Sequence, residues 1–189
     1  MDKAMLVLAA LLALAFLCIV VTYVVRAYIR FRGKRLVTCP ETKKIVAVDV
    51  DATHAALTIG RGIPELRLTS CTRWPERQDC GQECVSEIEL SPEECLVRNM
   101  LTNWYRGKEC VFCHKPIGQI HWADHKPALL NAEHRTVEWQ EIPPEKIPET
   151  LATHSPVCWN CHIAESFRQE HPELVTDRSM RKTAHAGRR

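Results

Sequence analysis

The sequence predicts an α+β protein in which a single N-terminal transmembrane helix carries a small, cysteine-rich domain stabilised by metal. Three observations lead to this prediction: an uncharged apolar segment near the N-terminus, ten cysteines among 189 residues, and strand-like alternation mixed with helix-like periodicity. About 150 residues remain beyond the apolar segment and its basic flank, which suffices for one or two small domains. Ten cysteines and eleven prolines in so short a chain indicate that metal ions or disulfides supplement the core.

The N-terminal segment has the length and composition of a membrane anchor. Ala4 to Val25 contains no charged residue, and a helix over this range spans about 33 Å, enough to cross the hydrocarbon core. The segment is too long for a signal-peptide core and lacks a small-residue cleavage site before the basic flank. Five of the residues from Arg26 to Arg35 are basic, so the positive-inside rule places the following domain in the cytoplasm. We therefore expect residues 1–35 to cross the lipid bilayer of a bacterial inner or plasma membrane once.

Residues 36–106 are predicted to form a cysteine-rich β/α module. Val37 to Leu68 is expected to be β structure, because Val46, Val48 and Val50 alternate with other residues and 65–69 alternates again after a turn at 60–64. The sequence Ser-Pro-Glu-Glu at 91–94 is a capping-box pattern that predicts the start of a helix, which Gly107 ends.

Residues 107–175 are predicted to form a second module that contains two Cys-x-x-Cys motifs. Segments 119–122 and 136–140 are expected to pair as a hairpin around 131–134, and 143–151 to form a short helix. A longer helix begins at Cys158 and ends at His171-Pro172. The basic residues 176–189 lack apolar periodicity, and we expect them to be disordered.

The two Cys-x-x-Cys motifs are the strongest chemical signal in the chain. Cys110 and Cys113 form one pair, Cys158 and Cys161 form the other, and 44 residues separate them. Each motif can place two thiolates on one side of a tight turn, and two such turns can close a tetrahedral zinc site with Zn–S distances of about 2.3 Å. A helix that starts at the second pair would stabilise thiolates through its dipole and free N–H groups.

This order of elements resembles the treble-clef zinc finger. A knuckle that carries the first pair, a hairpin, and a helix opened by the second pair follow one another from about 108 to 172. The resemblance implies that Cys110, Cys113, Cys158 and Cys161 are the ligands of one zinc ion. The insert between the pairs is longer than the pattern requires.

A second interpretation of the same motifs is a dihaem c-type cytochrome. Each motif extends to Cys-x-x-Cys-His, with His114 and His162 in the last position, and this is the attachment signature of c-type haem. In that case the cysteines would hold two haems covalently, the two histidines would be proximal ligands, and the domain would be periplasmic and carry electrons. The expected cytoplasmic orientation favours zinc instead.

Five further cysteines lie between the apolar segment and the two motifs. Four of them, Cys39, Cys71, Cys80 and Cys84, could close a second zinc site or hold an iron–sulfur cluster, and we assign Cys95 as a buried thiol. Some of these residues could equally be core thiols, because free cysteine is readily buried. On the outside of the membrane they would be expected to form disulfides.

The predicted function is binding rather than catalysis. Four thiolates leave a zinc ion no open position for water or substrate, so the metal would be structural. We expect an adaptor or assembly module that meets a protein partner at the membrane surface. No phosphate loop or nucleophile–base arrangement stands out. We therefore expect no enzymatic activity, no small-molecule substrate and no nucleic-acid partner. A metal or redox sensor with accessible thiols is a further alternative.

Overall fold

The computed structural model describes residues 3–74, 76–77 and 79–174, and these fall into two compact units. The first unit covers Met1–Asn103 and the second Trp104–Arg189. The basic tail at 176–189, for which we expected disorder, lies outside the described residues.

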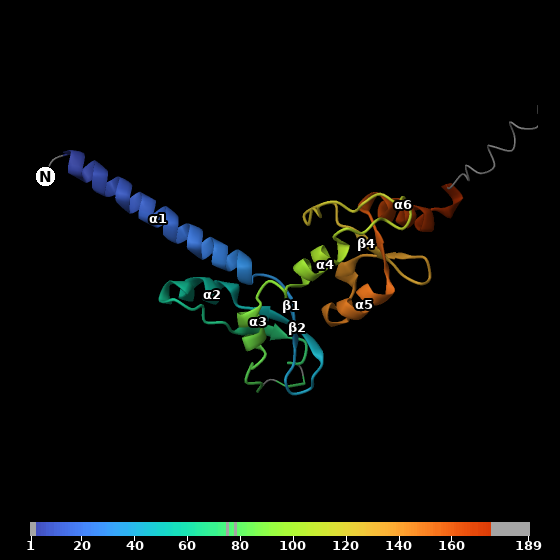
Figure 1. Ribbon diagram of the computed structural model, residues 1–189, viewed down its shortest axis with the longest axis horizontal. Helices are drawn as coiled ribbons and strands as arrows, with labels where there is room; N and C mark the ends of the chain where they lie inside the picture. The colour runs from blue at the N-terminus through green and yellow to red at the C-terminus, as the bar shows by residue number, and fades with distance from the viewer. Residues whose placement is uncertain (1–2, 75, 78, 175–189) are drawn as a thin grey trace, which may run out of the picture. The chain divides into compact units, whose positions relative to one another are not determined.

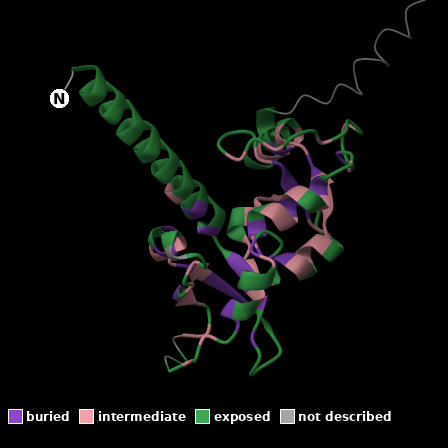
Figure 2. Cartoon of the chain, turned by 60° about the vertical axis from the view of Figure 1, so that its left-hand side comes forward, coloured by how far each residue is buried: buried purple, intermediate pink, exposed green. Residues whose placement is uncertain are grey.

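The apolar N-terminal segment forms one uninterrupted helix, α1 (Lys3–Phe31), which continues through most of the basic flank (Figure 1). This helix is long and apolar enough to cross a membrane, although a signal sequence has the same properties. Its side chains are exposed along nearly the whole length, and burial begins at Ala27 and Phe31 in its last turns (Figure 2). Exposed apolar side chains along a helix are the pattern expected when lipid, not protein, surrounds it.

The core of the first unit is built on a three-stranded antiparallel sheet. Its strands are β1 (Arg35–Thr38), β2 (Ile45–Val50) and β3 (Leu68–Cys71), in the order β1-β2-β3. The alternating valines of β2 confirm the strand predicted there, and all three are buried. The partner strand begins at Leu68, three residues after the predicted start at Glu65.

A helix replaces part of the β structure expected between Val37 and Leu68. Residues Ala52–Thr58 form α2, followed by the 3-10 turn η1 (Ile59–Arg61), so the prediction of β structure was wrong there. The Asp51 side chain accepts a hydrogen bond from the backbone N–H of His54 at 2.9 Å, which caps the helix start. Ala55 is fully buried in one core cluster with Phe31, so the last turn of α1 is fixed to the first unit by packing.

Two helices follow the sheet, and the second starts later than the capping-box pattern predicted. They are α3 (Val85–Leu90) and α4 (Val97–Tyr105). Ser91 ends α3 instead of opening a helix, because its backbone N–H donates to the Glu87 carbonyl at 3.1 Å. The predicted end at Gly107 is confirmed: its φ of 73° is a left-handed conformation that glycine adopts without strain.

The second unit contains a smaller sheet and two helices. Strands β4 (Ala128–Leu130), β5 (Thr136–Val137) and β6 (Ser155–Val157) are antiparallel in the order β5-β4-β6. The helices are α5 (Ile147–Thr153) and α6 (Trp159–Glu170), and the remaining turns are η2 (Trp139–Glu141), η3 (Pro144–Lys146) and η4 (Pro172–Leu174). The predicted short helix therefore exists as η3 and α5, and the predicted helix after Cys158 ends at His171 as expected.

The hairpin of the second unit uses a different first strand from the one predicted. Gln119–Trp122 is not a strand, and β5 pairs instead with β4. All three residues of β4 are apolar and buried, whereas Gln119 is exposed. Pairing β4 with β5 therefore buries more apolar surface than pairing the segment that begins at Gln119 would. Asn131 closes the turn: its side-chain oxygen accepts from the Arg135 backbone N–H at 2.8 Å.

Candidate metal centre

The first Cys-x-x-Cys motif lies in a tight turn, residues 110–115, that we call the knuckle. The backbone N–H of Cys110 donates to the Lys115 carbonyl, and the N–H of His114 donates to the Cys110 carbonyl, each at 2.9 Å. His114 has a φ of 55°, the left-handed conformation that such a closed turn requires. These bonds place the side chains of Cys110 and Cys113 on the same side of the turn.

The second motif lies where β6 passes into α6. Cys158 is the residue before the helix and has an extended backbone, with φ −74° and ψ 157°. The N–H of Val111 donates to the Pro156 carbonyl at 3.0 Å, so the knuckle is bound to the strand that leads into Cys158. This bond brings two turns that are 44 residues apart in the sequence into contact.

The four sulfur atoms converge on one point. All of the ligand atoms of Cys110, Cys113, Cys158 and Cys161 lie within 4.8 Å of one another, and the sulfurs of Cys113 and Cys158 are 3.8 Å apart. A tetrahedron with Zn–S bonds of about 2.3 Å has S···S edges of about 3.8 Å. The cluster expected from the sequence is therefore formed, with a geometry that could hold a metal ion.

The thiols of this downstream cluster differ in their affinity for protons. Burial opposes ionisation of Cys110, but hydrogen bonding from the backbones of Cys158, Cys113 and Phe112 outweighs it and lowers the pKa of Cys110 to about 6. Burial raises the pKa of both Cys158 and Cys161, and close sulfur neighbours raise that of Cys161 further. Four anionic sulfurs at these distances repel one another strongly, and a divalent cation at the centre removes that repulsion.

The two histidines of the motifs have different surroundings, and neither is among the four clustered ligands. His114 is exposed at the end of the knuckle. His162 is buried, and its Nδ1 lies 2.9 Å from Thr136 Oγ1 while its Nε2 lies 3.6 Å from Glu138 Oε1. His162 thus connects α6 to β5, a structural role that the motif did not indicate because Thr136 and Glu138 are distant in sequence.

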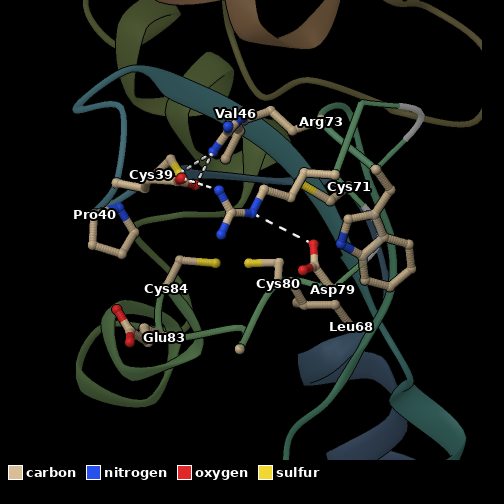
Figure 3. A pocket seen from close by; sticks show the side chains of 14 residues that line it. Cys39, Pro40, Val46, Leu68, Cys71, Arg73, Asp79, Cys80, Glu83 and Cys84 are labelled. Atoms are coloured by element: carbon tan, nitrogen blue, oxygen red, sulfur yellow. Dashed lines mark hydrogen bonds and ion pairs between the residues drawn. The ribbon is translucent and has the colours of Figure 1, made fainter.

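The upstream cysteines surround a cavity in the first unit. A cavity of about 230 Å³ is lined by charged residues that include Arg73 and Arg77, and by four of these cysteines: Cys39, Cys71, Cys80 and Cys84 (Figure 3). Among the described residues, the downstream cluster is the one group of three or more potential ligands found close enough to hold a metal ion, with its ligand atoms all within 4.8 Å of one another. Cys95 is buried as expected, and it is absent from the cavity lining.

Electrostatics also differ among the upstream thiols. Hydrogen bonding from the backbone of Thr42 lowers the pKa of Cys39 to about 7, and Arg73 donates to its sulfur from Nη1 at 3.0 Å. Burial raises the pKa of Cys84 to about 11, and the neighbouring thiols of Cys71 and Cys80 add to that rise. All ten cysteines lie within the described residues, and all are free thiols.

No protein-family model, curated protein or solved structure matches this chain.

Proposed function

We propose that the chain is a membrane-anchored zinc-binding protein whose second unit is a treble-clef-like binding module. The observation that carries the proposal is the convergence of four sulfurs, all within 4.8 Å of one another, on a knuckle and a helix start. Knuckle, hairpin and helix follow in the order expected of a treble clef. With four protein ligands, zinc has no position free for substrate, so its role is to stabilise the fold.

The same convergence favours one shared ion over two haems. Each c-type haem would need its own pair of thioether bonds and space for a macrocycle beside its motif. Sulfurs from different motifs lie 3.8 Å apart here, and the histidine of the second motif is held by side chains of β5 and of the segment after it. The arrangement therefore favours the small ion.

Elemental analysis and an absorption spectrum test the metal. Full-length protein purified in detergent under reducing conditions is expected to show no haem absorption bands and to lose zinc from the second unit in Cys110→Ser and Cys161→Ser. Cys18→Ser is the matched control, because Cys18 is an exposed thiol in α1. A red protein with a Soret band that survives denaturation would establish the dihaem alternative instead.

The proposed location is the cytoplasmic face of the membrane. Support comes from the long exposed helix α1 and the basic residues at its end, which favour the inner side. Fusing a cytosol-active fluorescent protein, or a periplasm-active phosphatase, to the C-terminus distinguishes the two orientations. We expect fluorescence and no phosphatase activity, and the reverse pattern would contradict the proposed location.

Support for a binding role comes from exposed apolar side chains near the metal ligands. Val111 and Phe112 on the knuckle, and Ile163 and Phe167 on α6, remain 37–49% exposed. The last two are four residues apart and so lie on one face of the helix. A photo-crosslinking residue at Phe112 or Phe167 is expected to join one defined protein in membranes, and at the exposed Glu133 to join none. Equal labelling at all three positions would argue against an adaptor surface.

A further inference from the structure

The upstream cysteines form a second feature of the molecule that the proposed zinc site does not use. Cys39 follows β1, Cys71 is the last residue of β3, and Cys80 and Cys84 lie in the connection to α3. Four thiols from three separate segments therefore face one cavity of about 230 Å³. In Figure 3 the sulfurs of Cys80 and Cys84 point toward each other.

The turn at Cys39 has the same backbone structure as the knuckle of the second unit. The N–H of Cys39 donates to the carbonyl five residues later, on Lys44, at 2.9 Å, and the N–H of Lys43 donates back to the Cys39 carbonyl at 2.8 Å. The same two bonds, at the same offsets, close the downstream knuckle. The residue four places after the cysteine is left-handed in both turns, with a φ of 58° at Lys43.

The two turns differ at one position that matters for ligation. Thr42 stands in the place that Cys113 occupies in the downstream knuckle. The upstream turn therefore presents one thiol, Cys39, instead of two. A four-sulfur site in the first unit would need its other ligands from elsewhere, and Cys71, Cys80 and Cys84 lie around the same cavity.

The cavity wall is more polar than an apolar core would be. Arg73 Nη1 lies 3.0 Å from the Cys39 sulfur and 2.9 Å from Glu41 Oε2, and Arg77 contacts Glu41 and Asp79. A divalent ion held by four thiolates carries a net charge of about −2, and adjacent guanidinium groups stabilise such a centre by charge and N–H···S bonds.

We infer that the first unit contains a second thiolate metal centre, formed by Cys39, Cys71, Cys80 and Cys84. This centre binds either one Zn²⁺ ion or an iron–sulfur cluster. Binding releases the thiol protons to solvent and draws the four sulfurs inward by side-chain rotation, with Arg73 retained as a donor to the Cys39 sulfur. Thiolate ligation is common to both metals, and their stoichiometry distinguishes them.

Metal counting on full-length protein tests this inference separately from the proposed function. Wild type is expected to contain two metal centres, Cys39→Ser and Cys84→Ser only the downstream zinc, and Cys110→Ser only the upstream metal. Cys95→Ala is the matched control in the same unit and should retain both. Zinc alone indicates a mononuclear site, whereas iron with acid-labile sulfide indicates a cluster. One centre in wild type, unchanged by Cys39→Ser, would overturn the inference and leave the downstream site intact.

A spectroscopic measurement covers the case in which a cysteine variant fails to fold. Trp74 lines the cavity, whereas the other four tryptophans belong to the second unit. In a Co²⁺ titration followed by tryptophan fluorescence, binding to the downstream cluster should give one step. Binding to the upstream thiols should give a second step by quenching Trp74. Trp74→Phe should lose the second step and keep the first. The same single-step titration in wild type and in Trp74→Phe would contradict the inferred site.

Discussion

Removing the metal from the second unit is expected to lower its stability strongly. Few apolar side chains there are fully buried, and they are small or scattered: Tyr105, Ala128, Leu129, Ile147 and Val157. Burial of a Leu, Ile or Val side chain contributes about 1.5–3 kcal/mol, while ordering costs about 1.5 kcal/mol for every residue. A core of this size does not stabilise the fold with a useful margin, and the metal has to supply the difference.

The size of the effect follows from mass action. Free zinc at about 1,000 times its dissociation constant stabilises the folded unit by about 4 kcal/mol. For a domain of 60–100 residues each kcal/mol shifts the melting temperature by about 4–8 °C, so chelation should lower it by about 16–32 °C. Because the shift depends on free zinc, it should grow with zinc concentration.

The assay uses the distribution of tryptophans. In Trp74→Phe every remaining tryptophan belongs to the second unit, so fluorescence reports the unfolding of that unit alone. Thermal unfolding is measured with zinc and with chelator, and zinc removal is verified by elemental analysis. The double variant Trp74→Phe/Cys161→Ser should have the melting temperature of the zinc-free protein both with zinc and with chelator. If chelation removes the zinc but the transition does not move, the metal is not structural and the reasoning fails.

Four further predictions concern individual side chains and protons. Tyr105 is buried and its hydroxyl donates to the Ala128 carbonyl at 2.8 Å. Tyr105→Phe should therefore lower the free energy of unfolding, measured by urea titration, by about 1–2 kcal/mol. An unchanged free energy would contradict a stabilising role for this hydrogen bond. Arg35 is fully buried and donates hydrogen bonds to the carbonyls of Arg30, Phe31 and Gly33 at 2.5–3.0 Å. Arg35→Met should therefore lower the free energy of unfolding of the first unit by about 3 kcal/mol. The control Lys34→Met, at the neighbouring position, should lower it far less. His162→Ala should cost about 1–3 kcal/mol yet leave the zinc content unchanged, and loss of zinc would make it a ligand. Burial raises the pKa of Cys158 and Cys161, so both thiols are protonated at pH 7 in the metal-free protein. Calorimetry in buffers of different ionisation enthalpy should therefore detect the release of at least two protons when zinc binds. The affinity for zinc should fall as the pH falls.

The downstream cluster was predictable because its geometry is mostly local. A Cys-x-x-Cys turn sets the separation of its own two sulfurs, and the helix after Cys158 was indicated by its periodicity and its His-Pro end. The long-range element is the bond from Val111 to Pro156, and no pattern in the sequence reports it. The clustering could nevertheless be predicted from the sequence, because four thiols can share one ion only if the fold brings them together.

Other features depend on tertiary contacts and could not be predicted. The short run of β4 has no periodicity that separates a strand from a buried helix turn, so the hairpin was assigned to the wrong segment. Helix α2 was missed because its apolar face is made of alanines, which signal weakly, and because its cap Asp51 also fits the alternation of β2.

Arg35 shows how one residue type can serve two purposes. Its position in a basic flank identified it as part of the topology signal, yet it is buried and binds the carbonyls at the end of α1. The last carbonyls of any helix lack partners within the helix, and a cation there offsets the negative end of the dipole. Which of five basic residues takes this role depends on the path of the chain into β1, and only the folded structure decides that.

Metal content and membrane orientation are linked predictions for this protein. Each of the two cysteine sets needs reduced thiols to bind metal, and the cytosol keeps thiols reduced whereas the periplasm oxidises them. Free thiols at 3.8 Å in the downstream cluster would be the first to form a disulfide across the two motifs if the domain were exported. A cytoplasmic domain should therefore contain metal and no disulfide, and an exported one the opposite. Finding zinc bound by reduced thiolates on an exported domain would break this link.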